Sequence, residues 1–218
     1  ERRAALHEVL QPGLDVRLSI DLGLQKRADE LLGKNKGALI LLNAQTGEIL
    51  VMASHPTYDP NLLEQTGQSL LTNPDSPLVN RAAQGAYPIG STLDPVLAAL
   101  FGPASNRTPE QVTKLFADLG FYTTPELYLP TGLAASPGEI ANLRVSPLQM
   151  VLAAAALSDE GVCPAPRIAL AVDTPAQGWV VLPTLESDRP ALSPNDARRV
   201  AEGMIAPGSP YWQLAGKA

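Results

Sequence analysis

Ser91 and Asp94 are the residues whose types and spacing most directly suggest chemistry in this sequence. A serine hydroxyl attacks a carbonyl carbon efficiently when a nearby base takes its proton and hydrogen-bond donors stabilise the oxyanion. Two positions three residues apart on a helix share one face, so these side chains could lie together. A helix N-terminus, however, stabilises the carboxylate form of an acid, which makes it a poor base near neutral pH. The pair therefore has the spacing of a nucleophile and its base without an effective base.

The same two residues also have a structural interpretation. Ser-x-x-Asp is a capping pattern that satisfies free backbone donors at a helix start, and Pro95 is tolerated in a first turn. We therefore expect a helix that begins at Ser91 and ends near Phe101, with Ser91 as a cap and not as a nucleophile. A working Ser91 that recruits another base is the alternative.

Several segments resemble the penicillin-binding protein transpeptidase family, in the order in which that family has them. The stretch from Asn80-Arg81-Ala82 to Tyr87-Pro88-Ile89-Gly90-Ser91-Thr92 is similar to the family's Asn-Arg-Ala…Tyr-Pro-Pro-Gly-Ser-Thr-Phe-Lys segment. Further resemblances lie at Val16 to Lys26, at Gly37 to Asn61, and at Ser146-Pro147-Leu148-Gln149-Met150 with Gly161. The resemblance thus extends from about Val16 to Lys217.

This resemblance implies an α+β fold, in which helices flank a five-stranded antiparallel sheet that serine β-lactamases share. It also implies an activity, the cross-linking of peptidoglycan stem peptides, with β-lactams as acylating mimics. The expected partners are stem peptides, β-lactams or other proteins of cell-wall synthesis and division, and neither a metal nor a cofactor is expected. The implied location is the extracytoplasmic face of the bacterial membrane, with any membrane anchor outside this chain.

Three motif positions depart from the family pattern. Asp94 stands where the family has the lysine that removes the proton from the serine. The family's Ser-x-Asn motif is matched only by Ala104-Ser105-Asn106, so Asn106 is either a remnant of a substrate-binding residue or part of a polar connector. The Lys-Thr/Ser-Gly motif is matched only by Lys217, which Ala218 follows. We therefore expect impaired catalysis, while an active transferase that uses Ser91 with Lys217 as its base remains the competing hypothesis.

Composition and charge exclude several other classes of protein. The formal charge of −6 argues against nucleic acid as a partner, and 45% hydrophobic with 17% charged residues is a globular composition. The single Cys163 excludes an internal disulfide and is expected to be a small packed side chain. His55 with Ser91 and either Asp59 or Asp94 could in principle form a triad, but its turn-rich surroundings favour a solvated loop histidine.

Hydrophobic periodicity and capping residues predict the elements that must position these residues. Asp21 is expected to cap a helix to about Leu32, with Leu24, Ala28 and Leu31 on its apolar face. The remaining predictions are strands at Val16 to Ile20, Arg167 to Val172, Gly178 to Leu182 and Tyr211 to Leu214, a hairpin of Gly37 to Leu42 with Ile49 to Ala53, mostly loop from Ser54 to Pro77, and helices capped at Thr108, Ser146 and Ser193.

The expected domain organisation is one transpeptidase-like domain over residues 16–218, preceded by a linker or the end of an upstream domain at residues 1–15. The start at Glu1-Arg2-Arg3 is typical of the middle of a longer protein. Segments that the family has after Phe101 and after Ala218 are expected to be missing from the sequence.

Overall fold

The computed structural model describes residues 13–137 and 140–204, which form helices and antiparallel strands in alternation. The helices are α1 (Leu22–Leu32), α2 (Leu63–Leu71), α3 (Arg81–Gln84), α4 (Asp94–Phe101), α5 (Pro109–Asp118), α6 (Pro147–Ser158) and α7 (Pro194–Met204), with short 3₁₀ turns η1 (Pro60–Leu62), η2 (Ala104–Asn106) and η3 (Ile140–Asn142). The strands are β1 (Val16–Leu18), β2 (Gly37–Leu42), β3 (Ile49–His55), β4 (Tyr87–Pro88), β5 (Arg144–Val145), β6 (Val162–Cys163), β7 (Ala169–Thr174), β8 (Gly178–Val181) and β9 (Arg189–Pro190).

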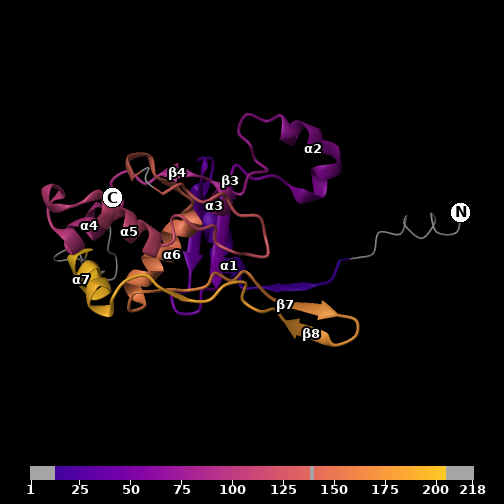
Figure 1. Cartoon of the computed structure of the whole chain (residues 1–218). Helices are drawn as coiled ribbons and strands as arrows, with labels where there is room; N and C mark the ends of the chain where they lie inside the picture. Colours follow the sequence, from indigo (N-terminus) through magenta and orange to yellow (C-terminus); the bar gives the residue numbers. More distant parts are fainter. Residues whose placement is uncertain (1–12, 138–139, 205–218) are drawn as a thin grey trace, which may run out of the picture.

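The β2–β3 hairpin stands between two layers of helix (Figure 1). Its strands alternate, so that successive side chains point to opposite faces. Val51 and Ala53 pack with Ala28 of α1 on one face. Ile40 and Met52 pack on the other face, against the main core, to which α6 contributes a fully buried Leu148 and other apolar side chains. This arrangement confirms the predicted hairpin and the predicted α+β class.

The turn of this hairpin depends on a glycine. Asn43 accepts hydrogen bonds from the amides of Gln45 and Thr46, which closes the turn. Gly47 has a φ of +70°, and a Cβ there would lie 1.8 Å from the carbonyl oxygen of Ala165. The turn therefore packs directly against the chain that leads into β7, and no larger residue fits.

A second sheet pairs β1, near the start of the described chain, with β7 and β8, which lie between α6 and α7 in sequence. β7 lies between β1 and β8, and the β7–β8 hairpin projects from the body, as α2 does elsewhere on the same side (Figure 1). The hydroxyl of Ser19 donates to the carbonyl of Ile49, and the amide of Ile49 donates to Arg167. These bonds tie the β1–β7–β8 sheet to the central hairpin. Within the described residues the strands make one three-stranded sheet and three two-stranded ones.

The predicted helix starts are largely confirmed. Asp21 caps α1, and full capping boxes open α5 with Thr108 and α6 with Ser146. Ser193 accepts from the amide of Asp196 and donates to its carboxylate at the start of α7. Each start was predictable because a cap bonds to residues within one turn of itself. The strand predicted at Tyr211 to Leu214 lies outside the described residues.

Two local predictions are wrong. The stretch from Ser54 to Pro77 was predicted to be mostly loop, yet it contains η1 and α2, which carries no buried residue. Asp59 starts this helical stretch by accepting from the amide of Asn61. On α1, only Ala28 of the predicted apolar face is buried, whereas Leu24 and Leu31 stay 43% and 59% exposed.

Gln149 offers a test of how the core depends on a buried polar side chain. Its Oε1 accepts from the amide of Ser146 at 2.9 Å, and its Nε2 donates to the carbonyl of Thr123 at 2.8 Å. The same Nε2 lies 3.3 Å from the carbonyl oxygen of Phe121. One buried side chain therefore serves as a cap for α6 and as a donor to the loop that follows α5.

We expect Gln149→Ala to lower the free energy of unfolding by at least about 2 kcal/mol, because buried carbonyls lose their donor. Gln111→Ala is the matched control, since Gln111 occupies the same place in the exposed capping box of α5. Its expected cost is below about 1 kcal/mol. Urea unfolding measured by circular dichroism distinguishes the two, and equal costs for both variants would contradict the assigned role of Gln149.

Candidate active site

Ser91 lies on an exposed turn between β4 and α4. Gly90 precedes it with a φ of +53°, a left-handed conformation that glycine adopts without strain. The turn is held by backbone bonds: the amide of Thr92 donates to Ile89 at 3.1 Å, and the amide of Asp94 donates to Ser91 at 3.1 Å. Leu93, between them, is buried and anchors the turn in the core. The hydroxyl of Ser91 is thus presented to solvent by a turn that the core fixes from below.

The predicted helix start at Ser91 is wrong, because α4 begins at Asp94. A helix that began at Ser91 would need the amide of residue 95 to donate to the carbonyl of Ser91, and Pro95 has no N–H. At the second position of α4 the missing donor costs nothing. The residue before α4 is Leu93, which makes no side-chain capping bond, so Ser91 is not the helix cap that the sequence suggested.

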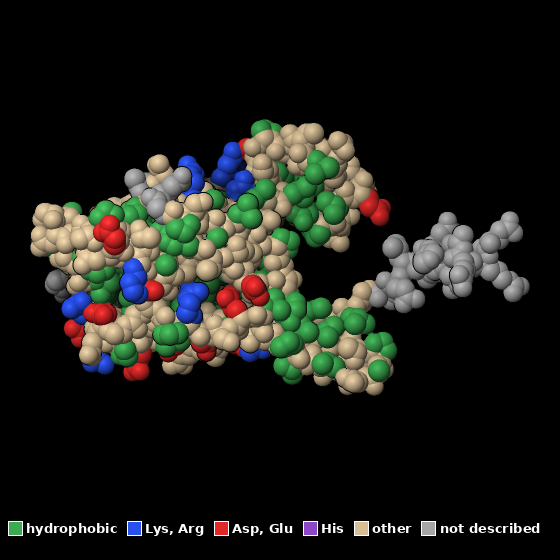
Figure 2. All heavy atoms as spheres, in the orientation of Figure 1, with side chains coloured by type: hydrophobic (Ala, Val, Ile, Leu, Met, Phe, Trp, Pro, Cys, Tyr) green, Lys and Arg blue, Asp and Glu red, His purple; other side chains and the backbone are tan. Residues whose placement is uncertain are grey.

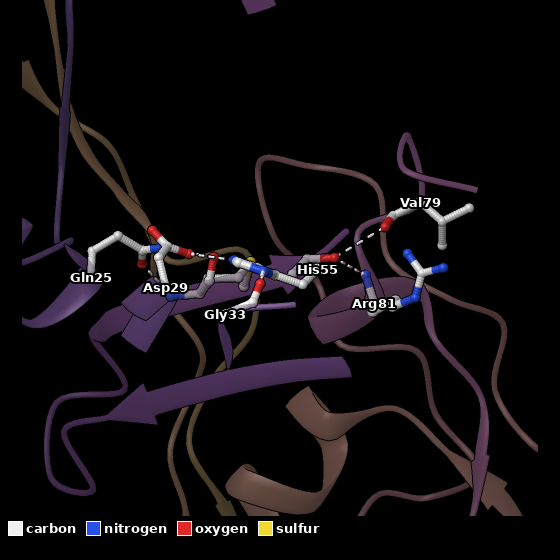
Figure 3. Close-up of polar contacts among 8 residues, drawn as sticks. Gln25, Asp29, Gly33, His55, Val79 and Arg81 are labelled. Carbon is white, nitrogen blue, oxygen red and sulfur yellow. Dashed lines mark hydrogen bonds and ion pairs between the residues drawn. The ribbon is translucent and has the colours of Figure 1, made fainter. Parts of the chain in front are cut away.

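The segment that leads to Ser91 is docked onto β3 (Figure 3). Asn80 caps α3 by accepting from the amides of Ala82 and Ala83, both buried, and its Nδ2 contacts the sulfur of Met52. The amide of Arg81 donates to the hydroxyl of Ser54 at 2.9 Å. The Asn-Arg-Ala triplet therefore has a clear structural role, the attachment of the Ser91 segment to the central hairpin.

A short strand pair holds the same segment from the other side. β4 pairs with β5, with Tyr87 opposite Val145. The amide of Ile89 then donates to the carbonyl of Leu143, and the guanidinium of Arg144 donates to Ala86. The backbone that carries Ser91 is consequently fixed at both ends.

An apolar hollow of about 350 Å³ lies beside the turn. It is formed by the start of β2, the strand β4 and the start of α6. The residues that line it are Gly37, Ala38, Tyr87, Pro88, Ile89, Thr92, Val145, Ser146, Pro147 and Met150. Because Thr92 is the residue after Ser91, a ligand in this hollow would lie next to the serine turn.

The other predicted site residues are not gathered at this turn. Asn106 ends η2, beyond the C-terminal end of α4, whereas Ser91 precedes its N-terminal end. Eight helical residues separate the two ends, a rise of about 12 Å. The carboxamide of Asn106 accepts from the hydroxyl of its neighbour Ser105. Lys217 lies outside the described residues.

His55 was predicted to be a solvated loop histidine, and this is wrong. It is the last residue of β3 and only 8% exposed, because β3 continues to pair with Gly37 at this position. Its Nδ1 donates to the carbonyl of Gly33 at 2.9 Å, and its Nε2 lies 3.2 Å from a carboxylate oxygen of Asp29. Both recorded polar partners come from α1 and the turn that ends it, so the ring serves that contact and not a triad with Ser91. No pattern near either residue indicates a contact between His55 and Asp29, which lie 26 positions apart.

No group of three or more His, Cys, Asp or Glu side chains within residues 13–137 and 140–204 is arranged to hold a metal ion. Likewise, no helix in the described part of the chain combines the length and the apolar character needed to cross a membrane.

Part of the chain is similar to one protein family, and its fold is similar to solved structures. Residues 37–115 match the model of the penicillin binding protein transpeptidase domain. The chain is 41% identical over 93 residues to the peptidoglycan D,D-transpeptidase MrdA of Escherichia coli K12. This match covers 40% of this chain and 15% of MrdA. The chain is also 43% identical over 89 residues to the peptidoglycan D,D-transpeptidase PbpA of Mycobacterium tuberculosis. That match covers 37% of this chain and 18% of PbpA. The matched part is therefore less than a fifth of these relatives.

Solved structures of transpeptidase domains have a similar fold. The D,D-transpeptidase domain of a peptidoglycan glycosyltransferase from Eggerthella lenta superposes with a TM-score of 0.76 at 20% identity, over 93% of this chain and 69% of that one. The ceftriaxone acyl-enzyme complex of penicillin-binding protein A from M. tuberculosis superposes with a TM-score of 0.75 at 22% identity. The superposition covers 94% of this chain and 64% of that one. The described chain thus has the fold of a transpeptidase domain. The sequence likeness to the penicillin binding protein transpeptidase model is confined to residues 37–115.

Cys163 is the other side chain that could in principle act as a nucleophile. It is buried in β6, and its thiol donates to the carbonyl of Leu152 at 3.4 Å. Burial raises the pKa of this thiol, while the nearby Arg189 opposes the shift. The structure therefore confirms the prediction of a small packed side chain.

We expect a neutral-pH thiol reagent such as iodoacetamide to modify native Cys163 at least about 100-fold more slowly than in denaturant, because the reactive thiolate is both rare and enclosed. Mass spectrometry of the alkylated chain over time measures both rates. The Cys163→Ser variant serves as the blank, and comparable rates in the folded and unfolded chain would contradict the buried placement.

Proposed function

We propose that this chain is a transpeptidase-like domain of peptidoglycan synthesis whose acylation chemistry is impaired, and that it acts as a binding or scaffold module in cell-wall assembly. Its ligand is a stem peptide or a protein of the cell-wall synthesis machinery, met on the extracytoplasmic face of the bacterial membrane. β-Lactams, as mimics of the stem peptide, are candidate ligands of the same turn.

Asp94 is the observation that carries this proposal. It is the first residue of α4, one turn after Ser91, and it is exposed. A carboxylate at this position is a weak base, so general-base catalysis, which typically contributes 10²- to 10⁴-fold, is largely lost. Its negative charge also repels a substrate that carries a carboxylate. Binding without efficient acylation is what this combination supports.

The retained scaffold argues that the turn still has a use. Ser91 remains exposed beside an apolar hollow, and the Asn80 and Ser54 contacts that position its segment are present. Penicillin-binding protein A of M. tuberculosis, whose structure is similar to this chain, has been solved as a ceftriaxone acyl-enzyme complex. A domain of the same fold with a weakened base is therefore a reasonable receptor for related ligands.

An active serine D,D-transpeptidase, acylated at Ser91 by stem peptides and β-lactams, is the second candidate. The exposed position of Ser91 favours this candidate, because the residue is accessible from solvent. This candidate requires a base other than Asp94, and Lys217 is the residue that the family order offers.

The first test is covalent labelling by a fluorescent penicillin. We expect the wild-type chain to take up label at least about 100-fold more slowly than a lysine-containing transpeptidase of this fold, because its base is weak. Gel fluorescence over time gives the rate, and Ser91→Ala is the control for non-specific labelling. Rapid labelling that Ser91→Ala abolishes would overturn the impaired-enzyme proposal in favour of the active one.

The second test restores a base. We expect Asp94→Lys to accelerate labelling at Ser91 by about 100-fold or more over the wild type, because an amine can take the hydroxyl proton when it is neutral. The position is exposed, so a lysine fits, at a cost of about 0.3–1 kcal/mol from the helix dipole. Asp94→Asn, which removes the charge without adding a base, is the matched control. Equal rates for the two variants would show that more than the base has been lost.

A further inference from the structure

The end of β3 contacts two different parts of the protein through adjacent residues, and Figure 3 shows both sets of contacts. Successive side chains of a strand point to opposite faces. His55 shares its face with Val51 and Ala53 and points to α1. Ser54 shares its face with Met52 and contacts the segment that leads to Ser91.

On the α1 side, polar contacts of His55 and Gln25 fix the strand end. The His55 ring bridges the carbonyl of Gly33 and the carboxylate of Asp29. Gln25 donates to the same carboxylate and accepts from the backbone amide of Met52. Since the carbonyl of Gly33 can only accept, Nδ1 carries a proton, and the ring orientation is set. The strand end therefore cannot shift along α1 without breaking these bonds.

On the other side, one hydroxyl holds two points of the incoming segment. Ser54 Oγ donates to the carbonyl of Val79 at 3.1 Å and accepts from the amide of Arg81 at 2.9 Å. These two residues flank Asn80, which caps α3. The hydroxyl thus fixes where the Ser91 segment leaves the surface of the hairpin.

The path from this point to Ser91 has little slack. A Cβ on Gly85 would lie 2.4 Å from the ring of Tyr87, and a Cβ on Gly132 would lie 2.9 Å from the carbonyl oxygen of Gln84. The amide of Gly132 also donates to Ala83. Because the chain is in close contact along this path, a displacement at Arg81 is carried forward to β4 and the serine turn.

We propose that Ser54 and His55 form a two-sided clasp that positions the Ser91 segment relative to α1 and the central hairpin. The clasp makes them positioning residues, since neither is among the residues that line the hollow beside Ser91. Its effect on ligand reactivity rests on the proposed function of the Ser91 turn, whereas its effect on the backbone does not.

Hydrogen exchange measured by mass spectrometry on the whole chain tests the backbone effect. We expect Ser54→Ala to accelerate exchange in residues 79–85 by about tenfold, because the amide of Arg81 loses its acceptor. His55→Ala should accelerate the same residues and also residues 29–33. Ser54→Thr should restore the wild-type rates, since it keeps the hydroxyl. Ser69→Ala is the matched control, because Ser69 bonds only within α2.

An unchanged rate in residues 79–85 of Ser54→Ala would overturn the clasp. So would an equal acceleration in the hairpin residues 39–42, because that result would indicate a general loss of stability. Ser54→Ala is a small change, so the test stands even if His55→Ala fails to fold.

Penicillin labelling in the Asp94→Lys background tests the effect on the site. Adding Ser54→Ala should lower the labelling rate at Ser91 by about fivefold or more, since misplacement of a nucleophile reduces its rate strongly. Ser54→Thr should retain the rate of Asp94→Lys alone. A rate that Ser54→Ala leaves unchanged would contradict the positioning role. If Asp94→Lys takes up no label, more than the base has been lost at the serine turn, and the exchange rates alone decide the clasp.

Discussion

β3 is the element on which the other parts of this domain depend, because its two faces are used for different purposes. The residues at 49, 51, 53 and 55 are buried, and those at 51, 53 and 55 meet α1, by packing or through the His55 ring. Met52 and Ser54 face the opposite way and receive the Asn-Arg-Ala triplet. A shift of one residue in the pairing of β3 with β2 would exchange these faces. The position of the serine turn is therefore set by the register of the hairpin.

The sequence predicted the features whose signals are local. A cap and the amides it bonds lie within one turn, so Thr108, Ser146 and Ser193 identified their helices correctly. The hairpin was predictable because Asn43 and Gly47 make a turn between two apolar runs. The fold class followed from these elements and from segments that resemble one family.

The features that sequence reasoning missed depend on proline geometry or on distant partners. The Ser-x-x-Asp pattern suggested a helix from Ser91, but the missing amide of Pro95 moves the start to Asp94. His55 was predicted to be solvated because its surroundings are turn-rich. In the structure it pairs with β2, and its ring contacts the carboxylate of Asp29 on α1. Residues that are far apart in the chain, as Asp29 and His55 are, carry no sign of their contact in their own neighbourhoods.

The segment around Ser91 combines two kinds of residue, those that hold it in place and those that the fold does not require. Asn80, Ala82 and Leu93 hold it to the hairpin and the core, so their loss would cost stability. Asp94 is exposed at a helix start, where either charge is tolerated at a cost of about 1 kcal/mol or less. The side chain at this position can therefore differ in charge while the turn keeps its shape. A family resemblance is therefore weak evidence about the reaction, because the chemistry depends on exposed side chains that the fold does not require.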